Sequence, residues 1–176
     1  MKAIGTIDSS KNFIDFEIEK PILRPHDLLI KVEAISINPV DTKVRKGIKD
    51  NLAEPKILGW DGLGTVVELG SETKLFKVGD KVFWAGDVTR SGSNAEFQAV
   101  DERIVGFAPK NLTKEKAVAM PLTSLTAYEL LFEKLEVTDE SKGKSLLIIN
   151  GAGGVGSVAI QMAKNAGLTV IATASN

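Results

Sequence analysis

The chain has 176 residues with 22 basic and 23 acidic side chains. Its net charge of −1 argues against a polyanion such as nucleic acid as a partner. No apolar run approaches the roughly 20 residues of a membrane-spanning helix. The chain lacks cysteine, which rules out thiolate metal sites within it and fits the reducing cytoplasm.

The N-terminal part of the chain shows the alternation of short, half-buried strands. Ile14, Phe16 and Ile18 alternate with acidic residues, which predicts a strand with one buried face. The next strand, 28–37, ends before Pro39 because a residue preceding proline prefers extended geometry. A short helical turn over 41–47 follows, and glycine-containing turns separate the later strands 64–69, 81–84, 95–100 and 103–107. Many short strands of this kind predict a β-barrel or a β-sandwich.

Helical periodicity replaces this alternation after residue 111. One short helix is expected over 115–120, stopped by Pro121. A second, 124–135, is expected to bury its large apolar residues Leu125, Tyr128, Leu131 and Phe132 or Leu135. A charged linker, 137–144, then precedes a buried strand (146–149), a helix and a final strand (168–173). The region of short strands is therefore followed by a βαβ unit.

The turn of that βαβ unit is rich in glycine. Gly151, Gly153 and Gly156 have the G-x-G-x-x-G spacing of a dinucleotide fingerprint, after a strand and before a helix. The first glycine allows the tight bend, the second lets a pyrophosphate approach, and the third allows close helix packing. Backbone N–H groups at the helix start, including Gly154 and Val155, then face the phosphates. The simpler interpretation is a turn that serves only strand-to-helix geometry.

The residues at the end of the second strand of the βαβ unit determine whether NAD or NADP is preferred. NAD sites place a carboxylate there, which binds the ribose hydroxyls and would repel the 2′-phosphate of NADP. Here the chain ends Ala174-Ser175-Asn176 without an acid. These small polar residues leave room for the phosphate. NADP(H) is therefore favoured over NAD(H), with Ser175 and Asn176 as candidate contacts.

Five motifs follow one another in a recognisable order: 37–41 with 45–47, 58–66, 77–82, 121–128 and 151–156. In this order the chain resembles the N-terminal half of medium-chain dehydrogenase/reductases, in the zinc-independent quinone oxidoreductase branch that includes ζ-crystallin. The resemblance implies a GroES-like β-barrel (1–125) for substrate and catalysis, followed by the first βαβ unit of a Rossmann domain (126–176). It also implies a homodimer with the active site in the cleft between domains. Because only half of the family's length is covered, we expect a truncated product of low activity.

The resemblance also bears on zinc. Catalytic zinc in this superfamily takes a cysteine from the loop that corresponds to 37–41, and a His-Glu pair from the segment that corresponds to 59–62. This chain has no cysteine, and its one histidine, His26, is expected in a surface turn. A tetrahedral site needs several such ligands. We expect no zinc.

Asn38 and Asp41 are the first candidate catalytic residues that the resemblance implies. Asn38 would face the nicotinamide and the substrate carbonyl, donating to an oxygen whose negative charge grows during hydride transfer. Its other possible role is to cap a turn before Pro39. Asp41 either orients Asn38 or Lys43, or caps a helical turn.

Trp60 and Asp61 stand where the zinc-binding pair would be. Trp60 would form an apolar wall beside the substrate. Asp61 would pair with Arg45 or Lys46, or hold backbone amides of its turn. Thr126 is implied near the nicotinamide ribose, a role compatible with helix capping.

The function expected from these residues is zinc-independent, NADPH-dependent reduction of a small quinone, enone or other carbonyl compound. The alternative is a non-catalytic nucleotide-binding or interaction module derived from the same scaffold. Neither reading involves nucleic acid or a membrane.

Overall fold

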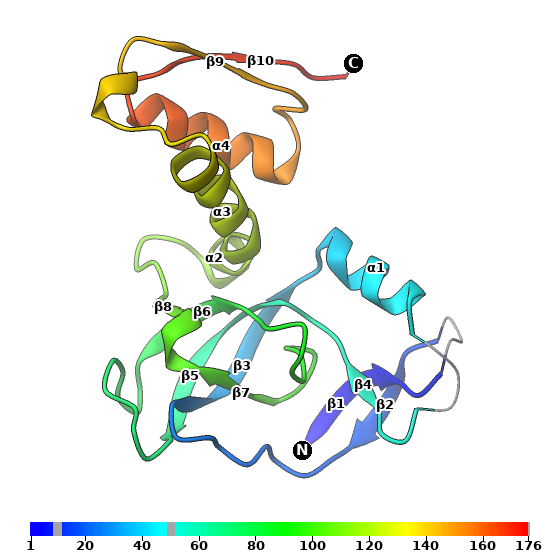
Figure 1. Ribbon diagram of the computed structural model, residues 1–176. Coiled ribbons are helices and arrows are strands. Elements are labelled where there is room, and N and C mark those ends of the chain that lie inside the picture. Colours follow the sequence, from blue (N-terminus) through cyan, green and yellow to red (C-terminus); the bar gives the residue numbers. More distant parts are fainter. Residues whose placement is uncertain (9–11, 49–51, 176) are drawn as a thin grey trace. The chain divides into compact units, whose positions relative to one another are not determined.

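The computed structural model describes residues 1–8, 12–48 and 52–175. It divides into two compact units, Met1–Pro121 (unit 1) and Leu122–Asn176 (unit 2) (Figure 1). The sequence placed the boundary between residues 125 and 126, a few residues later. Among the residues that the structure describes, no helix is long and apolar enough to span a membrane.

Unit 1 is built from short antiparallel strands. Its larger sheet has the order β7-β3-β5-β6-β8, formed by β3 (Asp27–Ser36), β5 (Asp61–Leu69), β6 (Lys81–Ala85), β7 (Phe97–Asp101) and β8 (Val105–Phe107). Its smaller sheet has the order β2-β1-β4, formed by β1 (Lys2–Thr6), β2 (Ile14–Glu17) and β4 (Lys56–Ile57). A core cluster packs against the larger sheet and consists of Leu28, Ile30, Val66, Val82, Trp84 and Val100. This is the mainly β domain that the alternation predicted.

The buried face expected of the strand formed by Ile14, Phe16 and Ile18 is only partly present. Ile14 is 44% exposed, whereas Phe16 and Ile18 are less so. Strand β2 lies at the edge of the three-stranded sheet and pairs only with β1. An edge strand has fewer neighbours to cover its side chains, so the alternation overstated the burial of Ile14.

Two helices depart from the expected bounds because of proline. Helix α1 (Pro39–Lys46) begins two residues early: Asn38 is extended as the N-cap, and Pro39 occupies the first helical position. Helix α2 (Lys114–Val118) ends before Pro121, as expected. Pro121 itself begins α3 (Pro121–Tyr128), which continues into a π-helical stretch, Glu129–Lys134. Two 3₁₀ turns, Glu102–Ile104 and Asp139–Ser141, complete the helical elements of the described residues.

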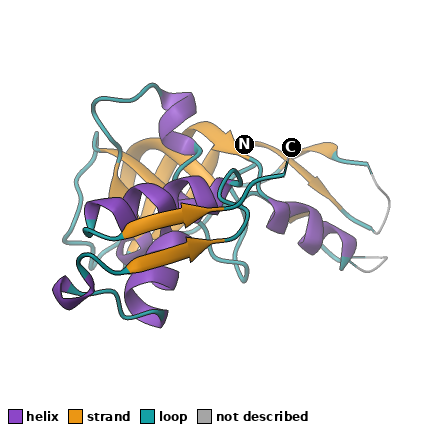
Figure 2. Ribbon diagram, turned by 90° about the horizontal axis from the view of Figure 1, so that it is seen from above, coloured by secondary structure: helices purple, strands orange, loops and turns teal. Residues whose placement is uncertain are grey.

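Unit 2 contains the predicted βαβ unit. Strands β9 (Ser145–Ile148) and β10 (Thr169–Ala172) pair in parallel, and α4 (Gly154–Asn165) connects them. Figure 2 shows the two strands side by side with the helix along one face. The core of this unit is small, with Ala127, Leu131, Ala159 and Ala163 buried.

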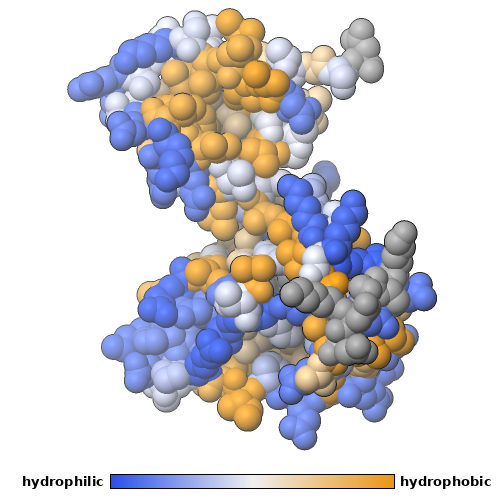
Figure 3. All heavy atoms as spheres, turned by 45° about the vertical axis from the view of Figure 1, so that its right-hand side comes forward, coloured by the Kyte–Doolittle hydropathy of each residue, from blue (hydrophilic) through white to orange (hydrophobic). Residues whose placement is uncertain are grey.

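Two expectations about burial in unit 2 are wrong. Leu125 and Tyr128 are each at least 50% exposed, because α3 packs through the small side chain of Ala127 instead. Leu131 is buried and Phe132 packs against the core, as expected of this helix, whereas the alternative Leu135 is 58% exposed. The strand expected to be buried on both sides leaves Leu147 58% exposed and Ile149 77% exposed. Hydrophobic residues accordingly gather on the surface of this unit (Figure 3).

A cluster around Glu33 gives unit 1 a testable pH dependence. The Glu33 carboxylate accepts hydrogen bonds from Lys114 (2.9 Å), from Lys81 and from Thr65 (2.5 Å). These bonds, led by that from Lys114, lower the pKa of Glu33 from 4.5 to about 2. Because the folded pKa is depressed, the stabilisation is complete above pH 4.5 and is lost as the pH falls toward 2.

Replacing Glu33 with glutamine tests this cluster. We expect the free energy of unfolding at pH 7 to fall by about 1–2 kcal/mol, a discounted value because both lysines are largely exposed. Urea unfolding between pH 7 and pH 2 would measure the difference, which should disappear toward pH 2. Glu68→Gln, an exposed change on the same sheet, is the control. A constant difference between Glu33→Gln and the unmodified protein over this range would contradict the assignment.

Candidate functional site

A buried polar pair lies where α1 begins and β5 starts. The side-chain amide of Asn38 donates from Nδ2 to Oδ2 of Asp61 over 2.7 Å. Asn38 is 7% exposed and Asp61 is fully buried. An amide nitrogen has two protons, so this bond fixes the orientation of the Asn38 side chain and leaves one proton for another acceptor. The sequence proposed Arg45, Lys46 or backbone amides as partners for Asp61 and did not anticipate Asn38.

Asp41 binds the backbone of the same asparagine, whereas Asp61 binds its side chain. Its Oδ2 accepts the backbone N–H of Asn38 at 2.7 Å, and it is the third residue of α1. A carboxylate at this position satisfies one of the N–H groups that a helix start leaves without a partner. Asp41 thus caps the turn and also holds Asn38, so the two suggested roles coincide.

Trp60 lies beside this pair in the chain and is 7% exposed. Its backbone carbonyl accepts the N–H of Gly86 at 2.9 Å, which ties it to the loop after β6. Burial of the indole is compatible with an apolar wall. Three other aromatic residues of unit 1 differ in burial: Trp84 is buried, and Phe83 and Phe97 are half-buried.

His26, the one histidine, is engaged by two glutamates. Its ring nitrogens lie 3.2 Å from Glu72 and 3.4 Å from Glu102. Burial raises the pKa of Glu102, but hydrogen bonds from the Leu75 and Lys74 amides outweigh it and leave that pKa below its usual value. Within the described ranges, no group of three or more His, Cys, Asp or Glu side chains is placed to hold a metal ion.

Close packing within the protein requires glycine at Gly153 and Gly156, two of the three predicted positions of the glycine turn of unit 2. A Cβ on Gly156 would lie 2.4 Å from the Asn150 carbonyl oxygen and 2.8 Å from Cα of Gly151. Helix α4 therefore packs on the turn through bare backbone. A Cβ on Gly153, the N-cap of α4, would lie 2.9 Å from the Asn150 side chain. The N–H groups of residues 154–156 begin the helix and have no carbonyl one turn earlier within it, which is the feature that binds anions.

The tight bend is made by Asn150 rather than by the first glycine. Asn150 has φ +59°, in the left-handed region that asparagine tolerates better than most residues. Gly151 is needed for a different reason, since a Cβ there would lie 2.7 Å from Cβ of Ala172. Thr173 supports both residues: its Oγ1 accepts the Asn150 N–H at 3.0 Å and its carbonyl accepts that of Gly151 at 2.7 Å. The sequence reasoning treated Thr173 only as the end of a strand.

The structure reveals less about the remaining residues that were predicted to bind the cofactor. The Thr126 hydroxyl donates to the Leu122 carbonyl at 2.8 Å, within α3, so it does not cap the helix. Gly154 and Val155 are the first two residues of α4. Ser175 is exposed beyond β10. Asn176 lies outside the described residues.

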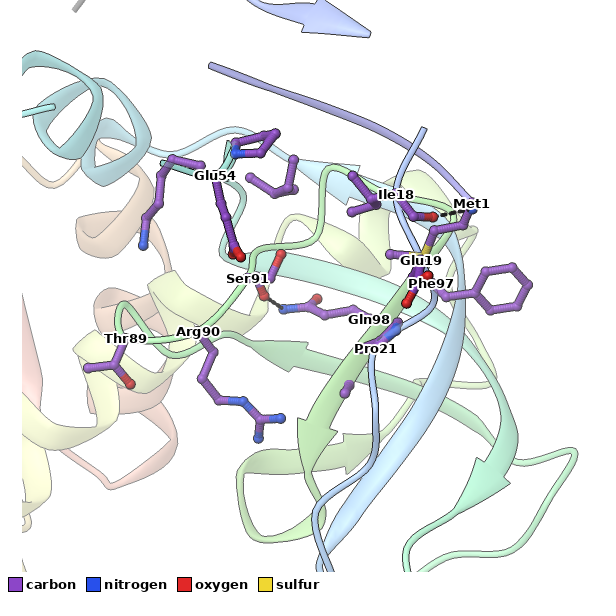
Figure 4. Close-up of a pocket in the computed structure, with 14 residues that line it drawn as sticks. Met1, Ile18, Glu19, Pro21, Glu54, Thr89, Arg90, Ser91, Phe97 and Gln98 are labelled. Atoms are coloured by element: carbon purple, nitrogen blue, oxygen red, sulfur yellow. Dashed lines mark hydrogen bonds between the residues drawn. The ribbon is translucent and has the colours of Figure 1, made fainter. Parts of the chain in front are cut away.

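A cavity of about 630 Å³ in unit 1 contains none of the predicted site residues. Residues of β4, of β7 and of the loop before β7 line it, with Met1, Glu19 and Phe97 along one side (Figure 4). Arg90 at its wall is already paired with Asp27 through two hydrogen bonds. Gln98 is held by the Ser91 carbonyl. The polar pair around Asn38 is thus separate from this cavity.

Comparison with known proteins places these features in a family. The family described as "Alcohol dehydrogenase GroES-like domain" matches residues 24–119. A "Zinc-type alcohol dehydrogenase-like protein" of Staphylococcus epidermidis is 48% identical over 99% of this chain and 54% of its own length. The "NADPH-dependent alkenal/one oxidoreductase, chloroplastic" of Arabidopsis thaliana is 39% identical over 92% of this chain and 42% of its own length.

Superposition on solved structures also shows similarity to oxidoreductases of this kind. A protein from Rhizobium etli CFN 42, assigned to the zinc-dependent alcohol dehydrogenases, superposes with a TM-score of 0.90 at 45% identity. It is covered over 53% of its length, and this chain over 100%. The quinone oxidoreductase of Coxiella burnetii superposes with a TM-score of 0.82 at 34% identity, covered over 57% against 100% of this chain. The chain spans about half the length of the curated relatives that it matches first.

Proposed function

The chain belongs to the alcohol dehydrogenase GroES-like family of medium-chain dehydrogenase/reductases, and on this premise we propose that it serves NADPH-dependent reduction of a small quinone, enone or other carbonyl compound. The observation that carries the proposal is the Asn38–Asp61 pair, which presents an oriented amide from a buried position. The names of relatives support the substrate class, since quinone and alkenal/one oxidoreductases are among them.

Asn38 is the proposed catalytic residue. When a carbonyl or enone accepts hydride at carbon, its oxygen gains negative charge, and a fixed N–H donor stabilises that charge. One Nδ2 proton of Asn38 is bound by Asp61, so the other is available to the substrate oxygen. Asp61 and Asp41 keep the side chain and the backbone of Asn38 in place. Trp60 would contribute an apolar surface that limits access of water.

The glycine turn of unit 2 fits a dinucleotide. Gly151, Gly153 and Gly156 let the turn pack closely against α4 and β10, and the amides of Gly154 and Val155 at the start of α4 would bind a pyrophosphate. When bound, NADPH would supply the hydride, while the chain provides orientation and electrostatics. Thr126 and Ser175 remain proposed contacts. We also propose that the reaction uses no zinc, since this chain contributes no cysteine and its histidine is engaged by Glu72 and Glu102.

Cofactor preference is tested at the end of β10. We expect NADPH to bind at least about tenfold more tightly than NADH, or ~1.4 kcal/mol, because no carboxylate there repels the 2′-phosphate. Fluorescence titration of both dinucleotides measures the ratio. Ser175→Asp should reverse the preference, with Ser175→Asn as the uncharged control. Tighter NADH binding by the unmodified protein would overturn the assignment.

The reaction itself is tested by NADPH oxidation with a quinone or enone acceptor. The assay is made on the 176-residue chain and on a chimera in which it replaces the matching part of the Rhizobium etli relative. Acceptor-dependent oxidation of NADPH by the chimera supports the proposal, and oxidation that persists unchanged without an acceptor contradicts it.

A second candidate function follows from the exposed apolar face of β9 and β10. A chain with this surface could act as a nucleotide-binding or interaction module without turnover. It would change NADPH fluorescence on mixing but give no acceptor-dependent oxidation in either protein.

A further inference from the structure

The segment that carries Trp60 and Asp61 is bound along its whole length by one loop. Residues 86–94, between β6 and β7, donate hydrogen bonds of 2.9–3.0 Å to five consecutive carbonyls. The donors and acceptors are Gly92 to Ile57, Asn94 to Leu58, the Ser93 amide to Gly59, Gly86 to Trp60, and the Ser93 hydroxyl to Asp61. Residues 58–60, which connect β4 to β5, are thereby given the fixed backbone that a sheet would give them.

This contact depends on glycines at the points of closest approach. Gly59 has φ +107°, and a Cβ there would lie 2.4 Å from the Ser93 hydroxyl oxygen. A Cβ on Gly92 would lie 2.3 Å from the Leu58 carbonyl oxygen. The two backbones therefore meet where side chains are absent, and Ser93 fits against the surface that Gly59 leaves open.

Ser93 is the member of the loop whose side chain reaches the site. It is fully buried, and its hydroxyl donates to the backbone carbonyl of Asp61 over 2.9 Å. The Asp61 carboxylate in turn accepts the Asn38 amide over 2.7 Å. Three buried residues thus form one chain of contacts from the loop to the proposed catalytic amide.

We propose that Ser93 is a positioning residue, which holds the backbone of Asp61 so that its carboxylate fixes the Asn38 amide. The inference rests on the catalytic role proposed for Asn38. A hydroxyl that merely satisfied a buried carbonyl would contribute to stability, whereas a positioning hydroxyl also determines the environment of the Asn38 side chain. The two roles predict different NMR signals for the NH₂ group of the Asn38 side chain.

The test uses the side-chain NH₂ signals of the ¹⁵N-labelled 176-residue chain. The Asn38 pair of signals is assigned by its loss in Asn38→Asp. In Ser93→Ala we expect this pair to shift toward its position in Asp61→Asn and to exchange faster with solvent. Thr89→Ala is the matched control: Thr89 belongs to the same loop, but its hydroxyl bonds Asp87 and touches none of the five carbonyls. That control should leave the Asn38 signals in place.

A second variant covers the case in which Ser93→Ala does not fold. In Ser93→Cys the thiol is a weaker donor at the same position, and the Asn38 signals should shift by an intermediate amount. Unchanged Asn38 signals in a folded variant overturn the proposal.

In the chimera, Ser93→Ala should lower kcat by about tenfold, the effect of ~1.4 kcal/mol, with little change in KM for NADPH. If Asn38→Ala leaves turnover intact, the proposed function fails while the coupling seen by NMR stands.

Discussion

We expect the replacement of Asn38 with alanine to lower kcat by about 100- to 1,000-fold in the chimera, the usual effect of removing one donor to a developing oxyanion. The proposed donor is the Nδ2 proton that Asp61 does not bind. The same change leaves a fully buried carboxylate without this hydrogen bond, so the free energy of unfolding should also fall by about 1–3 kcal/mol. Steady-state kinetics well below the melting temperature separate the two effects.

A double-mutant cycle makes this prediction specific. Asp61→Asn keeps the size of the side chain but removes its charge, and it should lower kcat by about tenfold because Asn38 is held less firmly. If Asp61 acts through Asn38, the double variant should be no slower than Asn38→Ala alone. Additive losses would show that Asp61 has a separate role. A melting temperature that falls while kcat stays unchanged would make Asn38 a structural residue.

Gly156→Ala should lower the affinity for NADPH by at least about tenfold. Its methyl group would be placed 2.4 Å from the Asn150 carbonyl oxygen and 2.8 Å from Cα of Gly151. Neither backbone atom can rotate away, so the first turn of α4 must shift away from the glycine turn. Such overpacking also costs about 1–3 kcal/mol of stability. NADPH fluorescence titration, with thermal unfolding in parallel, measures both quantities.

Gly47→Ala is the matched control for this substitution. A Cβ on Gly47, the C-cap of α1, would meet its nearest neighbour at an ordinary 3.5 Å, and its φ of −88° suits alanine. Both tryptophans of the chain lie in unit 1, so their fluorescence shows whether that unit stays folded in Gly156→Ala. Full NADPH affinity in a folded Gly156→Ala protein would contradict the proposed phosphate turn.

Much of the fold could be predicted because local patterns suffice for it. Alternation in residues 28–37 predicted β3, and the Asn38-Pro39 step predicted its end. The spacing of the glycines predicted the turn before α4, and the order of five motifs identified the family. Several of the errors concern burial: Tyr128 and Leu147 are apolar yet exposed. Hydrophobicity indicates what a residue would gain from burial, but only the neighbouring elements decide whether it is covered.

The sequence by itself determined the mainly β domain, the βαβ unit and Asn38, Asp41, Trp60 and Asp61 as candidates. Only the tertiary structure decided which of these residues are in contact: Asn38 binds both Asp41 and Asp61. Asn38 and Asp61 are 23 residues apart and meet because Asp61 pairs with Ser36 at the end of β3, just before Asn38. Ser93, a further 32 residues along, reaches Asp61 because glycines allow two backbones to touch. Contacts between residues so far apart leave no periodicity or spacing in the chain. They follow from strand register and close packing, which exist only once the chain has folded.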